Sequence, residues 1–204
     1  DVIETNSFGA NAFKLKSYGL EARVKDINIA AAAISRKAAG EGKRVLGSMG
    51  PTGKILMMGD VTTEELYNAF REQAISLCEG GADALVIETM SDLDEAVVAV
   101  KACKENTSAE VICTMPFEKT AEDTFHSMMG ITPAQMTTGL IEAGVDIIGA
   151  NCGTGIQNMI GIVKEIRTVS ADIPVLIHAN AGAPIYQDGK TVFPETPLQM
   201  AGYI

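Results

Sequence analysis

Short apolar segments alternate with helical segments along all 204 residues, and this alternation constrains the fold more than any other feature. The predicted strands are Asp1–Thr5, Arg44–Ser48, Ala84–Thr89, Glu110–Met115, Asp146–Ala150 and Pro174–Ala179. Strands that are separated by helices of about ten or more residues form βαβ units and a parallel sheet. Their near-continuous apolar runs are typical of strands that are covered on both faces. The chain is therefore predicted to be an α/β protein.

Helix signals fill the intervals between these strands. The expected helices run from about Ser17 to Gly40, from Thr62 to Cys78, from Leu93 to Cys103 and from Gln157 to Val169, and two more begin at Pro133 and Pro197. Thr62 and Glu65 have the spacing of a capping box, and Ser91 is expected to cap the helix that follows it. Residues 116–132 are expected to form a long loop.

Two architectures fit this pattern, a doubly wound sheet and a (β/α)₈ barrel. The doubly wound fold usually carries Gly-x-Gly-x-x-Gly after its first strand, and no predicted strand here is followed by it. The segment from Gly47 to Lys54 resembles a phosphate loop, but its spacing is one residue too long. Ile55 also stands where a Ser or Thr would bind magnesium. Nucleotide binding is therefore discounted.

The composition limits the partners and the compartment. A net charge of −10 argues against nucleic acid and against an anionic membrane surface as partners. No apolar run approaches the roughly 18 residues that span a bilayer, and no signal peptide is recognised. Four widely spaced cysteines do not form a disulfide framework, which favours a reducing, cytoplasmic location. Cys78, Cys103 and Cys113 are interpreted as packing residues.

Each predicted strand leads into polar or reactive side chains. These segments are Thr5-Asn6-Ser7, Ser48 to Thr52, Glu88-Thr89, Thr114-Met115, Asn151-Cys152 and His178 to Asn180. In a barrel they would meet at one mouth, where catalytic residues come from several strands. The pattern favours an enzyme over a binding module. Within the fifth strand, Gly149 is expected to admit a close backbone or a ligand.

Single residues at these strand ends leave alternatives open. Cys152 is either a reactive thiol or a buried structural cysteine. Glu88 either caps the next helix or holds the ammonium group of a ligand. Asn180 either satisfies turn amides or directs its oxygen at a metal. His178 is expected to be a core residue, and His126 is expected to lie on the surface.

Several motifs occur together in a distinctive order. They are Glu4-Thr5-Asn6-Ser7-Phe8-Gly9-Ala10-Asn11, Ser48-Met49-Gly50-Pro51-Thr52-Gly53, Glu88-Thr89-Met90-Ser91-Asp92, Gly149-Ala150-Asn151-Cys152-Gly153 and Asn180-Ala181-Gly182. Together they resemble the homocysteine S-methyltransferase family, and in particular the homocysteine-binding modules of cobalamin-dependent methionine synthases. The resemblance covers residues 1–204, which we interpret as a single domain truncated at both ends. It implies a (β/α)₈ TIM barrel, present here as an incomplete piece with about strands two to seven.

The resemblance also implies a zinc site. The family holds one zinc with three cysteine thiolates, and Cys152 matches the first of them. The other two form an adjacent pair that is expected about 30 residues beyond Ile204, one βα unit further on. Asn180 matches a residue that can occupy the fourth zinc position until the substrate thiol displaces it. With one zinc-binding thiolate of three, residues 1–204 are expected to bind zinc poorly in isolation.

A homocysteine site is implied by the same resemblance. Glu88 matches the carboxylate that holds the substrate amino group, and Asn6, Ser48 and Thr89 are assigned to the same site. Zinc would deprotonate the homocysteine thiol and keep it nucleophilic. The thiolate would then take a methyl group from a corrinoid (cobalamin) on a partner domain, which gives methionine.

Two alternatives to this function remain. In the first, the fold is the same but the thiol or the methyl donor differs, with betaine or S-methylmethionine as candidate donors. In the second, the chain is a non-catalytic barrel fragment that lacks the zinc site, and its open sheet has two exposed edges.

Overall fold

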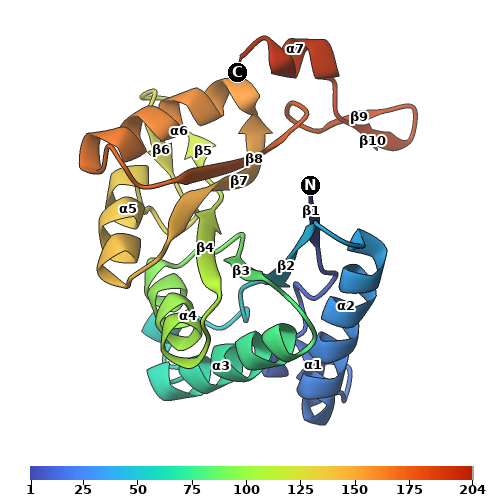
Figure 1. Cartoon of the computed structure of the whole chain (residues 1–204). Helices are drawn as coiled ribbons and strands as arrows, with labels where there is room; N and C mark the ends of the chain where they lie inside the picture. Colours follow the sequence, from blue (N-terminus) through green and yellow to red (C-terminus); the bar gives the residue numbers. More distant parts are fainter. Residues whose placement is uncertain (204) are drawn as a thin grey trace.

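A computed structural model describes residues 1–203, apart from the side chain of residue 154. Its main feature is a curled, six-stranded parallel sheet with the strand order β1-β2-β3-β4-β7-β8 (Figure 1). The strands are β1 Val2–Glu4, β2 Arg44–Met49, β3 Ala84–Ile87, β4 Glu110–Met115, β7 Ile147–Gly155 and β8 Val175–Asn180. The chain is therefore an α/β protein with a partial, TIM-barrel-like fold, and β1 and β8 form the two edges of the sheet.

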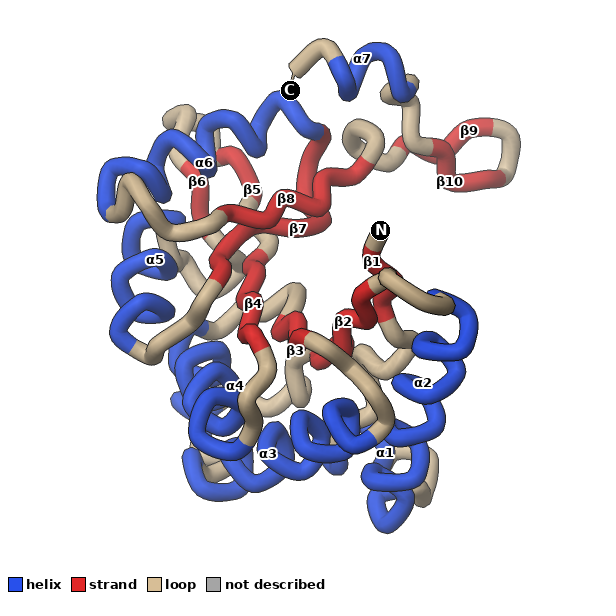
Figure 2. Tube along the Cα trace, in the orientation of Figure 1, coloured by secondary structure: helices blue, strands red, loops and turns tan. Residues whose placement is uncertain are grey.

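The helices lie on the outer, convex side of the curl, except α7, which lies beyond β8 near the C-terminus (Figure 2). They are α1 Ala12–Lys16, α2 Val24–Ala39, α3 Thr63–Glu79, α4 Leu93–Asn106, α5 Pro133–Glu142, α6 Ile156–Val169 and α7 Pro197–Ala201. The predicted capping box of Thr62 and Glu65 begins α3, and Pro133 stands in the first turn of α5. In the part of the chain that the structure describes, no helix is long and apolar enough to cross a lipid bilayer.

The structure corrects two helix predictions. The helix expected from Ser17 to Gly40 begins only at Val24, as α2, and is preceded by a 3₁₀ turn over Glu21–Arg23 and by the separate short helix α1, which ends at Lys16. The division follows from Gly19, whose φ of 67° is incompatible with a continuous right-handed helix. The cap of α4 is Asp92 rather than Ser91, because the Asp92 carboxylate accepts a hydrogen bond from the backbone N–H of Asp94 at 2.9 Å.

Two short antiparallel ribbons were not predicted from the sequence. The expected loop over residues 116–132 contains one of them, formed by β5 Glu118–Lys119 and β6 Phe125–His126. The other is formed by β9 Ile185–Gln187 and β10 Lys190–Val192 and extends from the sheet before α7 (Figure 1). Strands of two or three residues are too short to produce a readable alternation of apolar and polar positions.

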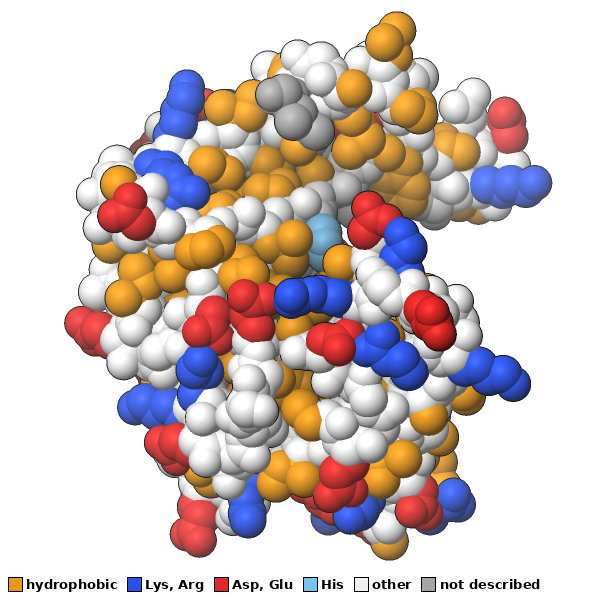
Figure 3. Space-filling view, in the orientation of Figure 1, with side chains coloured by type: hydrophobic (Ala, Val, Ile, Leu, Met, Phe, Trp, Pro, Cys, Tyr) orange, Lys and Arg blue, Asp and Glu red, His pale blue; other side chains and the backbone are white. Residues whose placement is uncertain are grey.

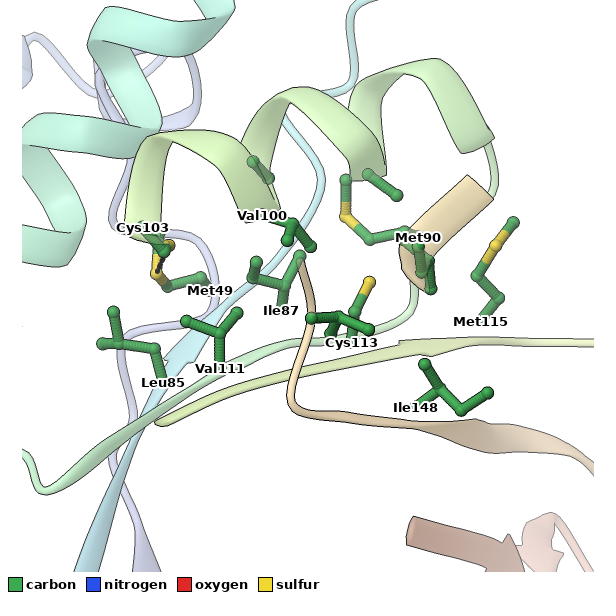
Figure 4. Packing of buried hydrophobic residues seen from close by; sticks show 14 of the residues in the cluster. Met49, Leu85, Ile87, Met90, Val100, Cys103, Val111, Cys113, Met115 and Ile148 are labelled. Atoms are coloured by element: carbon green, nitrogen blue, oxygen red, sulfur yellow. Dashed lines mark hydrogen bonds between the residues drawn. The ribbon is translucent and has the colours of Figure 1, made fainter. Parts of the chain in front are cut away.

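The core lies between the convex face of the sheet and the covering helices (Figure 4). Cys103 on α4 and Cys113 on β4 are both fully buried there, beside side chains such as Met49 and Ile148. Burial raises the pKa of both thiols, which makes them poor nucleophiles. The interpretation of these two cysteines as packing residues is confirmed, and Cys78 is half-buried.

Candidate active site

Polar side chains from five neighbouring strands meet at the carboxyl edge of the sheet. Because the strands are all parallel, their carboxyl ends lie along the same rim. The rim residues at or after the ends of β2, β3, β4, β7 and β8 are Ser48, Glu88, Thr89, Thr114, Asn151, Cys152 and Asn180. They form two hydrogen-bonded clusters, one around Glu88 and one around Asn151.

The first cluster is built on Ser48, which is 1% exposed. Its hydroxyl donates a hydrogen bond to Glu88 Oε1 at 2.5 Å, and its backbone N–H donates to Thr5 Oγ1 at 2.9 Å. The Ser7 hydroxyl donates to the Ser48 carbonyl oxygen at 2.7 Å. The Glu88 carboxylate is therefore held in place from the end of β2, at the predicted position for holding an ammonium group.

Glu4, the last residue of β1, adds a second carboxyl group to this cluster. Although part of its side chain is exposed, the pKa of Glu4 is raised from 4.5 to about 7. The largest cause is loss of hydration; a hydrogen bond to Glu88 and the charge of Glu88 act in the same direction, and a hydrogen bond with Ser48 acts against them. An incoming ammonium group would displace the proton that the two carboxyl groups share. Sequence reasoning did not select Glu4.

The second cluster is centred on the side chain of Asn151, which is 1% exposed. Its Oδ1 accepts hydrogen bonds from the Thr89 backbone N–H at 3.2 Å and from the Thr114 hydroxyl at 2.8 Å. Its Nδ2 donates to Thr89 Oγ1 at 2.7 Å and to Cys152 Sγ at 3.1 Å. One amide therefore connects the ends of β3, β4 and β7. In the sequence, Asn151 stood out only as part of a strand end and of a family motif, with no role assigned to it.

Cys152 is exposed, unlike the buried Cys103 and Cys113. The alternative of a buried structural cysteine is therefore wrong for this residue. Asn180 lies close by, because its Nδ2 donates to the Gly153 carbonyl oxygen at 3.0 Å. This bond joins Asn180 to a carbonyl group of β7 and not to turn amides before Gly182, so it tests neither alternative, and the metal-binding role remains a prediction.

The donors in the described residues do not complete a zinc site. No group of three or more His, Cys, Asp or Glu side chains in residues 1–203 is close enough to hold a metal ion. Near Cys152 the chain supplies one thiol and the amide of Asn180. A catalytic zinc ion takes three protein ligands and one exchangeable ligand. These residues are therefore too few to hold the ion on their own.

The remaining predicted residues have mixed outcomes. Asn6 is exposed in the bend after β1, and its role in substrate binding remains a prediction. His178 is exposed on β8, so its assignment to the core is wrong. The reason is that β8 is an edge strand, paired with β7 on one side only. His126 lies half-buried on β6.

Sequence comparison relates the whole chain to one enzyme family. The family model for homocysteine S-methyltransferase matches residues 1–204. The chain is 33% identical over 210 residues to a methionine synthase from Mycobacterium tuberculosis, and the match covers 98% of this chain. It is 31% identical over 210 residues to a methionine synthase from Mycobacterium leprae. The chain spans 17% of the length of each of these two relatives.

Structural comparison agrees on the fold. The metallated form of the homocysteine methyltransferase MmuM from Escherichia coli superposes with a TM-score of 0.73, over 89% of this chain and 67% of that chain, at 20% identity. The oxidized form of the same enzyme gives a TM-score of 0.70, over 88% of this chain and 65% of that chain, at 22% identity. At such identities the likeness shows the fold alone. On the match of its whole sequence, the chain belongs to the homocysteine S-methyltransferase family.

Proposed function

We propose that this chain binds homocysteine and presents its thiol for methylation, with methionine as the product. The observation that carries the proposal is the pairing of an exposed thiol, Cys152, with a fixed carboxylate, Glu88, on one rim. Glu88 precedes Thr89, and Thr89 is bonded through Asn151 to Cys152. A ligand with an ammonium group at one end and sulfur at the other suits that pairing. Family membership supports the same substrate.

The ammonium end of the ligand would lie against Glu88. Ser48 already donates one hydrogen bond to this carboxylate, which orients it and leaves its other lone pairs for the ammonium group. We assign Asn6 and Thr89 to the same end of the site, from their places after β1 and β3. Loss of Glu88 should therefore weaken binding of homocysteine more than it slows the chemical step.

The sulfur end of the ligand would lie at Cys152. We propose that Cys152 is one thiolate ligand of a zinc ion and that the Asn180 side chain is its exchangeable ligand. The other two protein ligands would come from outside the described residues. Bound zinc would keep the homocysteine sulfur deprotonated at neutral pH. The metallated form in which MmuM was solved supports a metal site in this fold.

The methyl carrier would be a corrinoid on a separate domain. The two named relatives are methionine synthases of which this chain matches 17%, which leaves room in them for further domains. We therefore take the chain as one substrate-binding unit of a longer enzyme, with its six strands as the second to the seventh of a complete barrel.

The test is homocysteine-dependent demethylation of methylcobalamin by the protein that contains this chain, measured for wild type, Cys152→Ala and Glu88→Gln. We expect Cys152→Ala to abolish turnover and Glu88→Gln to raise KM for homocysteine. Cys78→Ala is the matched control, because it removes a half-buried thiol from α3, away from the rim. Turnover by Cys152→Ala equal to that of the control would refute the proposal.

A further inference from the structure

The amide of Asn151 has no unused hydrogen-bonding capacity. Its oxygen accepts two hydrogen bonds and its nitrogen donates two, as many donors as an NH₂ group has. The orientation of the amide is also determined by its neighbours. The Thr89 backbone N–H can only donate, so the atom that faces it must be the oxygen, and the NH₂ group must face Thr89 Oγ1 and Cys152 Sγ.

The two residues held by this amide have unusual backbones. Thr89 has a φ of 61° and Cys152 has a φ of 57°, both in the left-handed region. That region is disfavoured for non-glycine residues and most of all for β-branched ones. Such conformations persist where the surroundings hold them, and they gather at functional sites. Asn151 bonds both the backbone and the side chain of Thr89, so Asn151 is the group that holds Thr89 in its left-handed conformation.

We propose that Asn151 is a positioning residue, whose N–H···S hydrogen bond directs Cys152 Sγ while the same amide fixes Thr89 next to Glu88. The inference builds on the proposed function, because it makes one side chain responsible for the spacing between the thiol end and the ammonium end of the site. Hydrogen bonds from neighbouring groups to metal ligands orient those ligands and tune them. The N–H group of Asn151 supplies such a bond from the residue next to Cys152 in sequence.

The substitution Asn151→Asp removes this bond, and it also places a carboxyl group beside Cys152 Sγ. A carboxylate keeps an oxygen for the Thr89 N–H and the Thr114 hydroxyl, and its second oxygen can accept from the Thr89 hydroxyl. The contact with Cys152 Sγ is the one that cannot form again, because an oxygen replaces the donor. Thr114→Val is the matched control. It removes one hydrogen bond to the same amide at a site that is 0% exposed and leaves the N–H···S contact in place.

The first readout is the rate at which iodoacetamide alkylates Cys152 in metal-free protein, followed by mass spectrometry of its peptide. We expect Asn151→Asp to slow alkylation about tenfold, near the upper end of the effect of losing one hydrogen bond, because Sγ loses the donor that directs it. Thr114→Val should be alkylated at close to the wild-type rate, because it retains the N–H···S contact. Equal rates for wild type and Asn151→Asp would overturn the proposal.

The second readout uses variants that keep Asn151, in case Asn151→Asp does not fold. The side-chain NH₂ resonances of Asn151 in the ¹⁵N–¹H spectrum should move when Cys152 is alkylated and when it is replaced in Cys152→Ser. Unmoved resonances would show that the N–H···S bond is absent and would overturn the proposal. Neither readout needs homocysteine, so both test the role of Asn151 even if Cys152→Ala proves fully active in methyl transfer.

Discussion

Replacement of Gly149 by alanine should separate the two strands that carry Cys152 and Asn180. A Cβ atom on Gly149 would lie 1.7 Å from the Leu176 carbonyl oxygen, half the 3.4 Å at which ordinary contact begins. Gly149 and Leu176 are direct partners in the β7–β8 pairing, so relief of the clash must lengthen the hydrogen bonds beside them. Overpacking costs about 1–3 kcal/mol and two lost hydrogen bonds cost about 1 kcal/mol each, which gives a loss of roughly 3–5 kcal/mol.

The assay is thermal unfolding followed by circular dichroism. For a chain of this size, such a loss lowers the midpoint by about 10 °C, at roughly 2–4 °C per kcal/mol. Gly9→Ala is the control, because no atom lies within 4 Å of a Cβ built there. Its free energy of unfolding should change by less than about 0.5 kcal/mol. Equal unfolding midpoints for Gly149→Ala and Gly9→Ala would refute the close approach of β7 and β8 at Gly149.

Three further outcomes are expected. The pKa of Glu4 is raised to about 7, so the folded state favours its protonated form and stability should fall as the pH rises from 4.5 to 7; urea unfolding of Glu4→Gln should lose this dependence, and a flat wild-type profile would contradict it. A thiol reagent should label Cys152 in the native protein but Cys103 and Cys113 only after denaturation, and rapid native labelling of all three would refute their burial. Thr62→Ala should cost about 1 kcal/mol through loss of the α3 cap, measured by urea unfolding; an unchanged midpoint would argue against the capping box.

The regular part of the fold was predictable because its signals are long and local. Each of the six strands contains a short apolar run, and the β4 prediction, Glu110–Met115, matches the structure at both ends. The predictions failed where a single residue redirects the chain. At Gly19 a positive φ interrupts what the composition alone would allow as one helix. The short ribbons β5–β6 and β9–β10 consist of strands of two or three residues, which leave no periodic signal.

Several residues on the rim of the candidate site were predictable from the sequence, but the hydrogen bonds that join them were not. The resemblance to the family selected Ser48 and Glu88, and the structure joins them by a hydrogen bond. Glu4 was missed because a carboxylate at the end of a short strand has no pattern that distinguishes it from a solvated surface residue. His178 was misjudged because an apolar run predicts burial on both faces, which an edge strand such as β8 does not provide. Figure 3 shows the hollow that the open side of the curl leaves in this view.

The link through Asn151 contradicts the simplest rule of strand geometry. Successive side chains of a strand point to opposite faces, so Asn151 and Cys152 should not meet. They do meet, at 3.1 Å, because Cys152 has left the extended conformation for a positive φ. Thr89, next to Glu88, also has a positive φ, and its backbone N–H is bonded by the same amide. No residue type in the sequence signals these two conformations, since glycine is the usual occupant of that region. The Asn151 side chain thus both holds Thr89 in its strained conformation and bonds the exposed thiol of Cys152. Because the sequence signals neither conformation, this connection is visible only in the three-dimensional structure.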